Sequence, residues 1–218
     1  MIDTERAGII ARMDPDKQKR VIAAGMTEFR KGYQKASTDN IAGKAGISKG
    51  LLFHYFGSKK VLLWYLLSVA LSVIRTGYTE QIDRCETDLL NRLLQAAYLK
   101  LELSAEHPAV FAFVEKIYFS DEPECADARD WLRDNVAPDW PDDEFSLRGI
   151  SLDHFRSDID PRVAVEAVRY TLSGYASNAL SDFETTGAFW ENADRIMTGM
   201  QKYIELFRKT FYRASKGS

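Results

Sequence analysis

The chain has 218 residues, of which 45% are hydrophobic and 28% are charged, and its formal net charge is −3 at pH 7. This composition is typical of a folded globular protein and excludes a disordered one. The two cysteines, Cys85 and Cys125, form no CxxC pair, and the three histidines are scattered. The sequence therefore predicts no metal site, no cofactor and no disulfide framework, and it fits a protein of the reducing cytoplasm.

The charge is unevenly distributed along the chain. Between Asp14 and Trp64 there are ten Lys and Arg against four Asp and Glu, whereas from Tyr65 to Ser218 there are seventeen against twenty-six. A basic N-terminal part on an acidic remainder suggests that the basic part meets a polyanion. A charged, solvated surface is the alternative, and charge alone does not decide between them.

Residues 1–13 carry no helical pattern, so we expect an arm without fixed structure. Asp14 or Asp16 can cap the first clear helix, with Pro15 tolerated in its first turn. This helix is predicted to run to about Lys31, because apolar residues recur at helical spacing and Gly32 follows.

Two short helices are predicted next. The first is capped by Ser37 or Thr38 and stops at Gly46, a residue suited to a left-handed helix end. The second is capped by Ser48 and runs to about Tyr55. Ser58 can then cap a longer helix that begins at Lys59.

The remaining pattern is almost wholly helical. We predict helices over 59–79, 86–106, 108–119, 123–135, 161–182 and 187–213, and a short one near 145–155 in the least regular stretch. The apolar run Val61–Ile74 is shorter than the roughly 20 residues of a membrane span, which favours a buried core helix. The prediction is an all-α protein with an N-terminal three-helix domain, residues 1–58, and a larger helical domain, residues 59–218.

The segment Ser37–Lys60 carries the functional signal. Ala42 and Ala45 allow its two short helices to approach closely, Gly46 makes the turn between them, and Ile47 fills the corner. This is the pattern of a helix-turn-helix, whose second helix fits the major groove of DNA.

The stretch from Ile41 to Lys59, IAGKAGISKGLLFHYFGSK, resembles the signature of the tetracycline-repressor (TetR) family of regulators. With the first helix, the resemblance covers roughly residues 14–64. It implies a homodimer in which each subunit offers one DNA-binding head to half of a palindromic operator in double-stranded DNA.

The resemblance also implies the DNA contacts. The onset of the second helix would hold the DNA backbone, the start of the third would face the groove, and its aromatic end and the next helix start would grip phosphates. The residues are Ser37, Thr38, Ser48, Lys49, Gly50, Leu51, His54, Tyr55, Lys59 and Lys60. Lys49 can reach a base edge or a phosphate, and Leu51 stands where the family often has a small polar residue.

The two long C-terminal helices, about 161–182 and 187–213, are the predicted dimer interface. The first carries an apolar stripe with Val165, Val168 and Leu172, and the second one with Ile196 and Phe207. An ordinary helix facing its own core would show the same stripes, and only the resemblance favours the interface.

A small, partly apolar effector is expected to bind among the middle helices. The candidate lining residues, each of which could equally be core or surface, are Tyr98, Glu102, Phe111, Glu115, Tyr118, Trp131, Phe155 and Tyr170. The resemblance implies a ligand-responsive regulator, by default a repressor that releases its operator when the effector binds. The alternatives are a helical scaffold or an enzyme with a non-functional head, although the sequence contains no nucleophile elbow, HExxH or glycine-rich phosphate loop.

Overall fold

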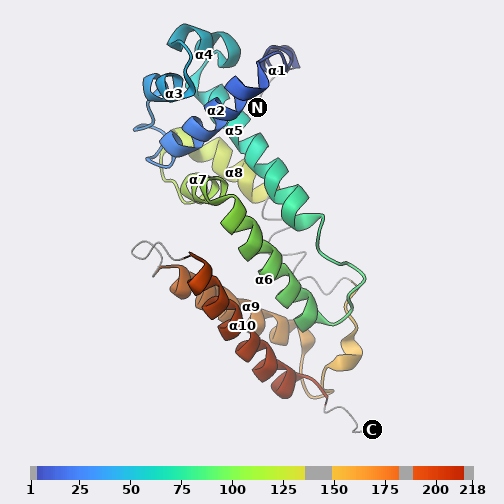
Figure 1. The fold of residues 1–218 in the computed structure, drawn as a ribbon. Helices are drawn as coiled ribbons and strands as arrows, with labels where there is room; N and C mark the ends of the chain where they lie inside the picture. Colours follow the sequence, from blue (N-terminus) through green and yellow to red (C-terminus); the bar gives the residue numbers. More distant parts are fainter. Residues whose placement is uncertain (1–3, 136–148, 182–188, 214–218) are drawn as a thin grey trace. The chain divides into compact units, whose positions relative to one another are not determined.

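The computed structural model describes residues 4–135, 149–181 and 189–213, and the regular elements in these ranges are all helices (Figure 1). The chain forms two compact units. The first, which we call the head unit, comprises Met1–Thr76 and His107–Ala137, and the second, the body unit, comprises Gly77–Glu106 and Pro138–Ser218. Each unit is described by itself below.

Five helices open the head unit: α1 Thr4–Ala11, α2 Pro15–Phe29, α3 Thr38–Ala45, α4 Lys49–Phe56 and α5 Lys59–Ile74. The starts of the last four follow the predicted caps. Asp14 accepts a hydrogen bond from Lys17 N at 3.0 Å, and the hydroxyls of Ser37, Ser48 and Ser58 cap α3, α4 and α5. These short polar side chains satisfy amide groups that the first helical turn leaves unpaired.

The N-terminal segment is a helix, α1, rather than the expected arm. Ile10 and Met13 are buried, and Arg6 donates to the carbonyl oxygen of His54 at 2.9 Å. Its eight residues are too few for a stable isolated helix. Contacts with the rest of the head unit therefore hold α1 in place, and its own sequence pattern does not reveal them.

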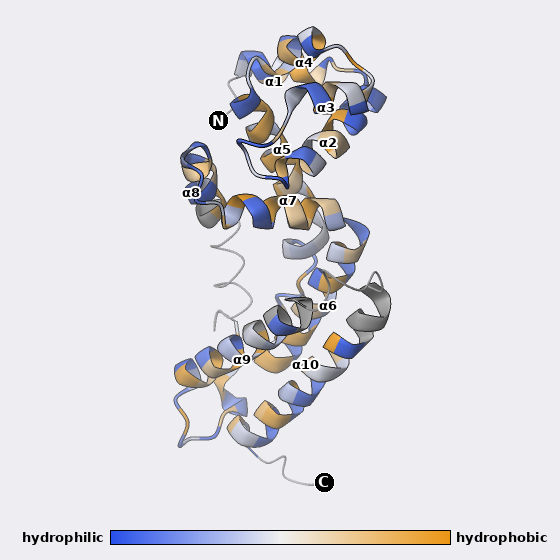
Figure 2. Cartoon of the chain, turned by 90° about the vertical axis from the view of Figure 1, so that its left-hand side faces the viewer, coloured by the Kyte–Doolittle hydropathy of each residue, from blue (hydrophilic) through white to orange (hydrophobic). Residues whose placement is uncertain are grey.

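Helix α5 forms the core of the head unit, and its hydrophobic residues are visible in Figure 2. The segment Lys59–Thr79 is apolar and long enough to cross a membrane by length and composition. Leu63, Leu66 and Leu67 are nevertheless fully buried within the protein, which identifies a core helix. A Cβ at Gly25 would lie 2.7 Å from Leu66 Cδ1, so α2 packs closely on α5 because this position is glycine. The end of the predicted helix, Arg75–Thr79, is a π-helical turn.

Helices α7, Pro108–Tyr118, and α8, Ala126–Asn135, also belong to the head unit. Phe113 of α7 packs edge-on against Phe29 of α2 with ring centroids 6.3 Å apart, and Trp131 of α8 packs against Trp64 at 5.5 Å. The short 3₁₀ turn Pro123–Cys125 precedes α8. The compact units therefore do not divide at the predicted boundary between residues 58 and 59, which stays a prediction about functional domains.

The body unit contains α6 Leu89–Glu106, the 3₁₀ turn Leu152–His154, α9 Pro161–Ser181 and α10 Phe189–Phe211. Asp88 caps α6 by accepting from Leu90 N, and it pairs with Arg208 of α10 at 2.6 Å. Tyr212 donates to the same carboxylate at 3.0 Å. Burial acts to raise the pKa of Asp88, but hydrogen bonds, above all that of Arg208, outweigh it and lower the pKa below its ordinary value. One charged cluster therefore joins α6 to α10.

The apolar stripes predicted for the two C-terminal helices face the core of the body unit. Val165, Val168, Leu172, Ile196 and Phe207 are all buried. The alternative of core-facing stripes is thus the correct one for these residues. The outward apolar side chains of α9 and α10, among the residues described, are Val163, Tyr170 and Leu206. The predicted short helix over 145–155 lies partly outside the described residues, and its end forms the 3₁₀ turn.

A buried carboxylate holds the loop between α2 and α3 in place. The Glu28 side chain is 1% exposed, and its Oε1 accepts from Lys31 Nζ at 2.7 Å and from Lys44 Nζ at 3.2 Å. Its Oε2 accepts from Ser37 N at 3.4 Å. Glu28 thereby ties α2 to the loop that follows and to α3. The hydrogen bond from Lys31 is the largest cause that lowers the pKa of Glu28 to about 2.

We expect Glu28→Gln to lower the free energy of unfolding by about 2 kcal/mol at pH 7, because the amide loses charge-assisted hydrogen bonds. The folded pKa lies below the unfolded value of 4.5, so the stabilisation is fully present above pH 4.5 and is lost as pH falls towards 2. Urea denaturation at pH 7 and pH 3 should therefore give a smaller difference between variant and wild type at pH 3. The matched control is Glu115→Gln at an exposed glutamate of the same unit, and a control as destabilising as Glu28→Gln would contradict the assignment.

Candidate DNA-binding site

The turn between α3 and α4 is built on one glycine. Gly46 has φ 66° and ψ 36°, a left-handed conformation that residues with a Cβ adopt at a cost. Ile47 N then donates to Ala42 O at 3.0 Å, which closes the end of α3. Ala42 and Ala45 are buried, as their small size predicted. The result is a helix-turn-helix with α4 as its second helix.

Helix α4 has a buried side and an outward side. Leu52 and Phe56 are each 1% exposed and anchor the helix in the head. Ser48, Lys49, Gly50 and His54 are exposed, and Leu51 and Tyr55 are half-buried. The residues predicted to face the groove therefore lie at the accessible N-terminal end of this helix.

Gly50 lies in open surroundings. A Cβ at this position would meet only Ser48 Oγ, at 4.0 Å, so folding does not require a glycine here. Another surface can therefore approach the backbone of α4 closely.

Lys49 is paired within the helix-turn-helix. Its Nζ lies 2.9 Å from Asp39 Oδ1 on α3, and both side chains are more than half exposed. An exposed pair of this kind is worth at most about 1 kcal/mol, so the ammonium group can exchange Asp39 for another anion at little cost.

The three serine caps leave donors at the helix starts. The hydroxyl oxygens of Ser37 and Ser48 accept from Asn40 N at 3.2 Å and from Leu51 N at 3.1 Å. Each hydroxyl keeps its proton for donation, and the remaining first-turn amides stay available for anions. Thr38 is half-buried beside Ser37.

Arg6 is a structural residue of the site that the sequence did not indicate. Its guanidinium donates to the carbonyl oxygens of His54 and Tyr55, at the C-terminal end of α4. A cation at a helix C-terminus satisfies unpaired carbonyls and is favoured by the helix dipole. The rings of His54 and Tyr55 pack edge to face at 5.4 Å.

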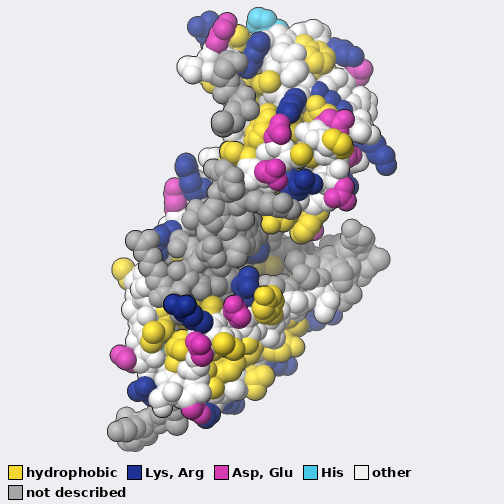
Figure 3. Space-filling view, turned by 180° about the vertical axis from the view of Figure 1, so that it is seen from behind, with side chains coloured by type: hydrophobic (Ala, Val, Ile, Leu, Met, Phe, Trp, Pro, Cys, Tyr) yellow, Lys and Arg dark blue, Asp and Glu magenta, His cyan; other side chains and the backbone are white. Residues whose placement is uncertain are grey.

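Lys59 and Lys60 have partners in the head unit. Lys60 Nζ lies 2.7 Å from Asp127 Oδ2, and Lys59 Nζ lies 4.7 Å from the ring centroid of Tyr33. Burial lowers the pKa of Lys59, although the charges of nearby glutamates oppose this. On the face seen in Figure 3, acidic and basic side chains are interspersed over the head.

The eight predicted effector-pocket residues are divided between the units. Phe111, Glu115, Tyr118 and Trp131 lie on α7 and α8 of the head unit, whereas Tyr98, Glu102, Phe155 and Tyr170 lie in the body unit. Phe155 is 3% exposed in the body core, and Tyr170 is 67% exposed. Of the eight, Trp131 is in the lining of a hollow of the head unit.

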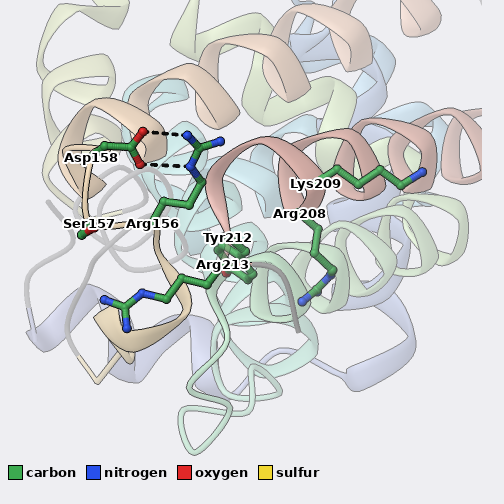
Figure 4. Close-up of a pocket in the computed structure, with 7 residues that line it drawn as sticks. All are labelled: Arg156, Ser157, Asp158, Arg208, Lys209, Tyr212 and Arg213. Atoms are coloured by element: carbon green, nitrogen blue, oxygen red, sulfur yellow. Dashed lines mark hydrogen bonds and ion pairs between the residues drawn. The ribbon is translucent and has the colours of Figure 1, made fainter. Parts of the chain in front are cut away.

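The described parts of both units contain hollows. One of about 470 Å³ lies in the head unit and includes Trp64 and Trp131 in its lining. The other, of about 720 Å³, is lined by Arg156, Arg208, Lys209 and Arg213 among others (Figure 4). Arg156 is paired with Asp158, Arg208 is paired with Asp88, and the side chains of Lys209 and Arg213 point apart, so the cations do not converge on one position.

Comparison with known proteins agrees with this geometry. Residues 21–66 match the family model described as "Bacterial regulatory proteins, tetR family". The chain is 38% identical over 66 residues to the transposon Tn10 TetC protein of Escherichia coli, which covers 30% of this chain and 34% of that protein. It is 26% identical over 97 residues to the nucleoid occlusion factor SlmA of Actinobacillus pleuropneumoniae serotype 5b (strain L20), covering 44% and 48%. The chain thus spans less than half the length of these curated relatives.

The fold agrees over a longer part of the chain. A TetR family transcriptional regulator from Chloroflexus aurantiacus J-10-fl superposes with a TM-score of 0.65 and 17% identity, covering 94% of this chain and 97% of that one. The family model accounts for the helix-turn-helix, and the structural likeness extends the same helical architecture to the C-terminal part. Residues 21–66 therefore carry the N-terminal domain of the tetR family of bacterial regulatory proteins, and the chain shares the fold of a solved tetR family regulator.

Proposed function

We propose that this chain represses transcription as a cytoplasmic homodimer, which binds a palindromic operator through α3 and α4 and releases it when a small effector binds. The carrying observation is the outward N-terminal end of α4 on a helix-turn-helix closed by Gly46. In the proposed complex this end enters the major groove, as recognition helices do in this motif. The amides and hydroxyls at the starts of α3 and α4 hold phosphates on either side.

The side chains of α4 divide between two tasks in this proposal. Lys49 and Leu51 face the groove, with Leu51 packing on a thymine methyl group, and Gly50 lets the backbone approach. The C-terminal end of α4 and the starts of the neighbouring helices contact the phosphates. The residues are His54, Tyr55, Lys59, Lys60, Ser37, Thr38 and Ser48. The Leu51 side chain supplies no hydrogen bond, so sequence preference at that step comes from its apolar contact.

Lys49→Ala is expected to weaken operator binding about ten-fold, because one charge-assisted contact is lost. Fluorescence anisotropy with a duplex from the DNA flanking the chain's own gene, measured across a salt series, checks this. If Lys49 contacts a phosphate, the slope of log K against log salt becomes shallower by about 0.9; if it contacts a base, the slope is unchanged. Lys202→Ala, at an exposed lysine of α10, is the matched control. Equal affinities of both variants and wild type would contradict the site.

A second pair of variants separates contact from folding. Gly50→Leu and Gly43→Leu both place a side chain in open space on a helix of the head, so both should fold at least as stably as wild type. Only the first should abolish duplex binding, because its side chain stands between α4 and the groove.

The dimer in this proposal uses the outward side of α9 and α10. Among the described residues of these helices, three large apolar side chains are exposed: Val163 61%, Tyr170 67% and Leu206 55%. Arg169 lies over the ring of Tyr170, with 4.7 Å between its Cζ and the ring centroid. A twin subunit covering these side chains would remove apolar surface from water, and a two-fold pair of heads suits half-sites about 34–36 Å apart.

Tyr170→Glu combined with Leu206→Glu is expected to convert the dimer to a monomer, since both charges would be buried against the twin. Sedimentation equilibrium measures the mass. The control is Leu152→Glu, at an apolar residue that is 49% exposed outside α9 and α10. A wild-type chain that sediments as a monomer would overturn the proposed interface.

The effector in this proposal is a small, partly apolar molecule that binds among the middle helices, as their aromatic residues suggest. It lowers operator affinity only if it binds the DNA-free conformation more tightly than the DNA-bound one. We therefore expect, in a thermal-shift screen of fatty acids and aromatic acids, that compounds which raise the melting temperature also weaken operator binding. Stabilising compounds that leave operator affinity unchanged would contradict release by an effector.

A further inference from the structure

The segment that joins α7 to α8, residues 120–127, is acidic. It contains Asp121, Glu122, Glu124 and Asp127 and no Lys or Arg. We call it the acidic elbow. It contacts the loop between α2 and α3 and the start of α5, both of which border the helix-turn-helix.

The elbow holds the loop through two glutamates. Glu122 Oε2 accepts a hydrogen bond from Gln34 N at 3.0 Å, and Glu124 Oε1 accepts one from Gln34 Nε2 at 3.5 Å. The Glu122 carboxylate also fills the space beside Gly32, where φ is 101° and an added Cβ would lie 2.5 Å from Oε1. The loop therefore receives a specific acidic side chain, and its glycine provides the room.

The elbow also pairs with one of the two lysines at the start of α5, and the loop that it holds contacts the other. Asp127 pairs with Lys60 at 2.7 Å. Lys59 Nζ lies over Tyr33 and 3.4 Å from Gln34 O, within the electrostatic influence of Glu122 and Glu124. One of the two ammonium groups proposed to contact phosphates is thus paired with a carboxylate, and the other binds the loop that Glu122 and Glu124 hold.

We propose that the acidic elbow is an intramolecular competitor of DNA: Asp127 occupies Lys60 in the free protein, Glu122 and Glu124 hold the loop whose Gln34 carbonyl binds Lys59, and operator phosphates must displace these contacts. The proposal rests on the proposed function, since it concerns how the same head is regulated. The carboxylates of the acidic elbow offer a lysine the same kind of partner as a phosphate does, namely an anionic oxygen.

The contacts of the elbow are weak enough to lower DNA affinity without preventing binding. We call this effect of the elbow the intramolecular competition. Lys60 and Asp127 are both exposed, and exposed ion pairs contribute little individually. The expected gain on removing the competing carboxylates is therefore about three- to ten-fold in duplex affinity.

The position of the elbow allows a movement of α8 to change the intramolecular competition. Asp127 lies in the first turn of α8, and Glu122 and Glu124 lie just before that helix. A shift of α8 relative to α5 would change the Lys60–Asp127 contact without any change inside α3 or α4. A movement of α8 can thus alter the affinity of the head for phosphates through charge.

The test is duplex binding by Asp127→Asn, by Glu124→Gln and by the double variant. Binding should tighten in each, most in the double variant. The dependence on salt should become steeper in the variants with Asp127→Asn, because the Lys60–Asp127 pair no longer has to open. Asp121→Asn is the matched control: it removes the same charge one residue from Glu122, where the described residues provide no ion-pair partner. Its affinity should stay near that of wild type.

A double-mutant cycle separates this contact from a general charge effect. In a Lys60→Gln background, Asp127→Asn should no longer tighten binding, because the lysine it releases is absent. If Asp121→Asn tightens binding as much as Asp127→Asn, or if the gain persists without Lys60, the intramolecular competition is overturned while the DNA-binding function stands. If wild type and all variants fail to bind any duplex at low salt, both the proposed function and the intramolecular competition are overturned.

Discussion

The buried carboxylate of Glu28 is the constraint on which the head depends. A charged group without water must be paired, and Glu28 finds its partners in Lys31, in Lys44 and in the amide of Ser37. These partners lie before, within and at the cap of α3. One side chain of α2 therefore sets where α3 starts and how it lies, and the turn at Gly46 then sets α4. The position of the surface proposed to bind DNA therefore depends on a residue buried in the head unit.

Local signals made the helix-turn-helix predictable from sequence. Serine caps and a left-handed glycine act within four residues of their own position, so their effect can be read from the chain. Arg6 and the acidic elbow could not be predicted in this way, because their partners lie 48 or more residues away. The stripes on α9 and α10 were recognisable as apolar, but sequence periodicity cannot distinguish a core from an interface.

The division of the chain into units changes how its middle helices are understood. Sequence suggested a head that ends near residue 58, followed by one large domain. In the structure α7 and α8 pack on the head through Phe113 and Trp131, whereas α6, between α5 and α7, belongs to the body unit. Residues that border the proposed DNA-binding surface are thus found well beyond the recognisable motif, and three of them, Glu122, Glu124 and Asp127, are acidic.

The discontinuous head has a consequence for synthesis on the ribosome. Helix α5 emerges with its leucines exposed, and one of the helices that cover them, α7, is translated only after all of α6. Until then the nascent chain presents an apolar segment long enough to resemble a membrane span. The helix-turn-helix motif is complete early in translation, but its hydrophobic support arrives late, so chaperones have a period in which to bind this segment.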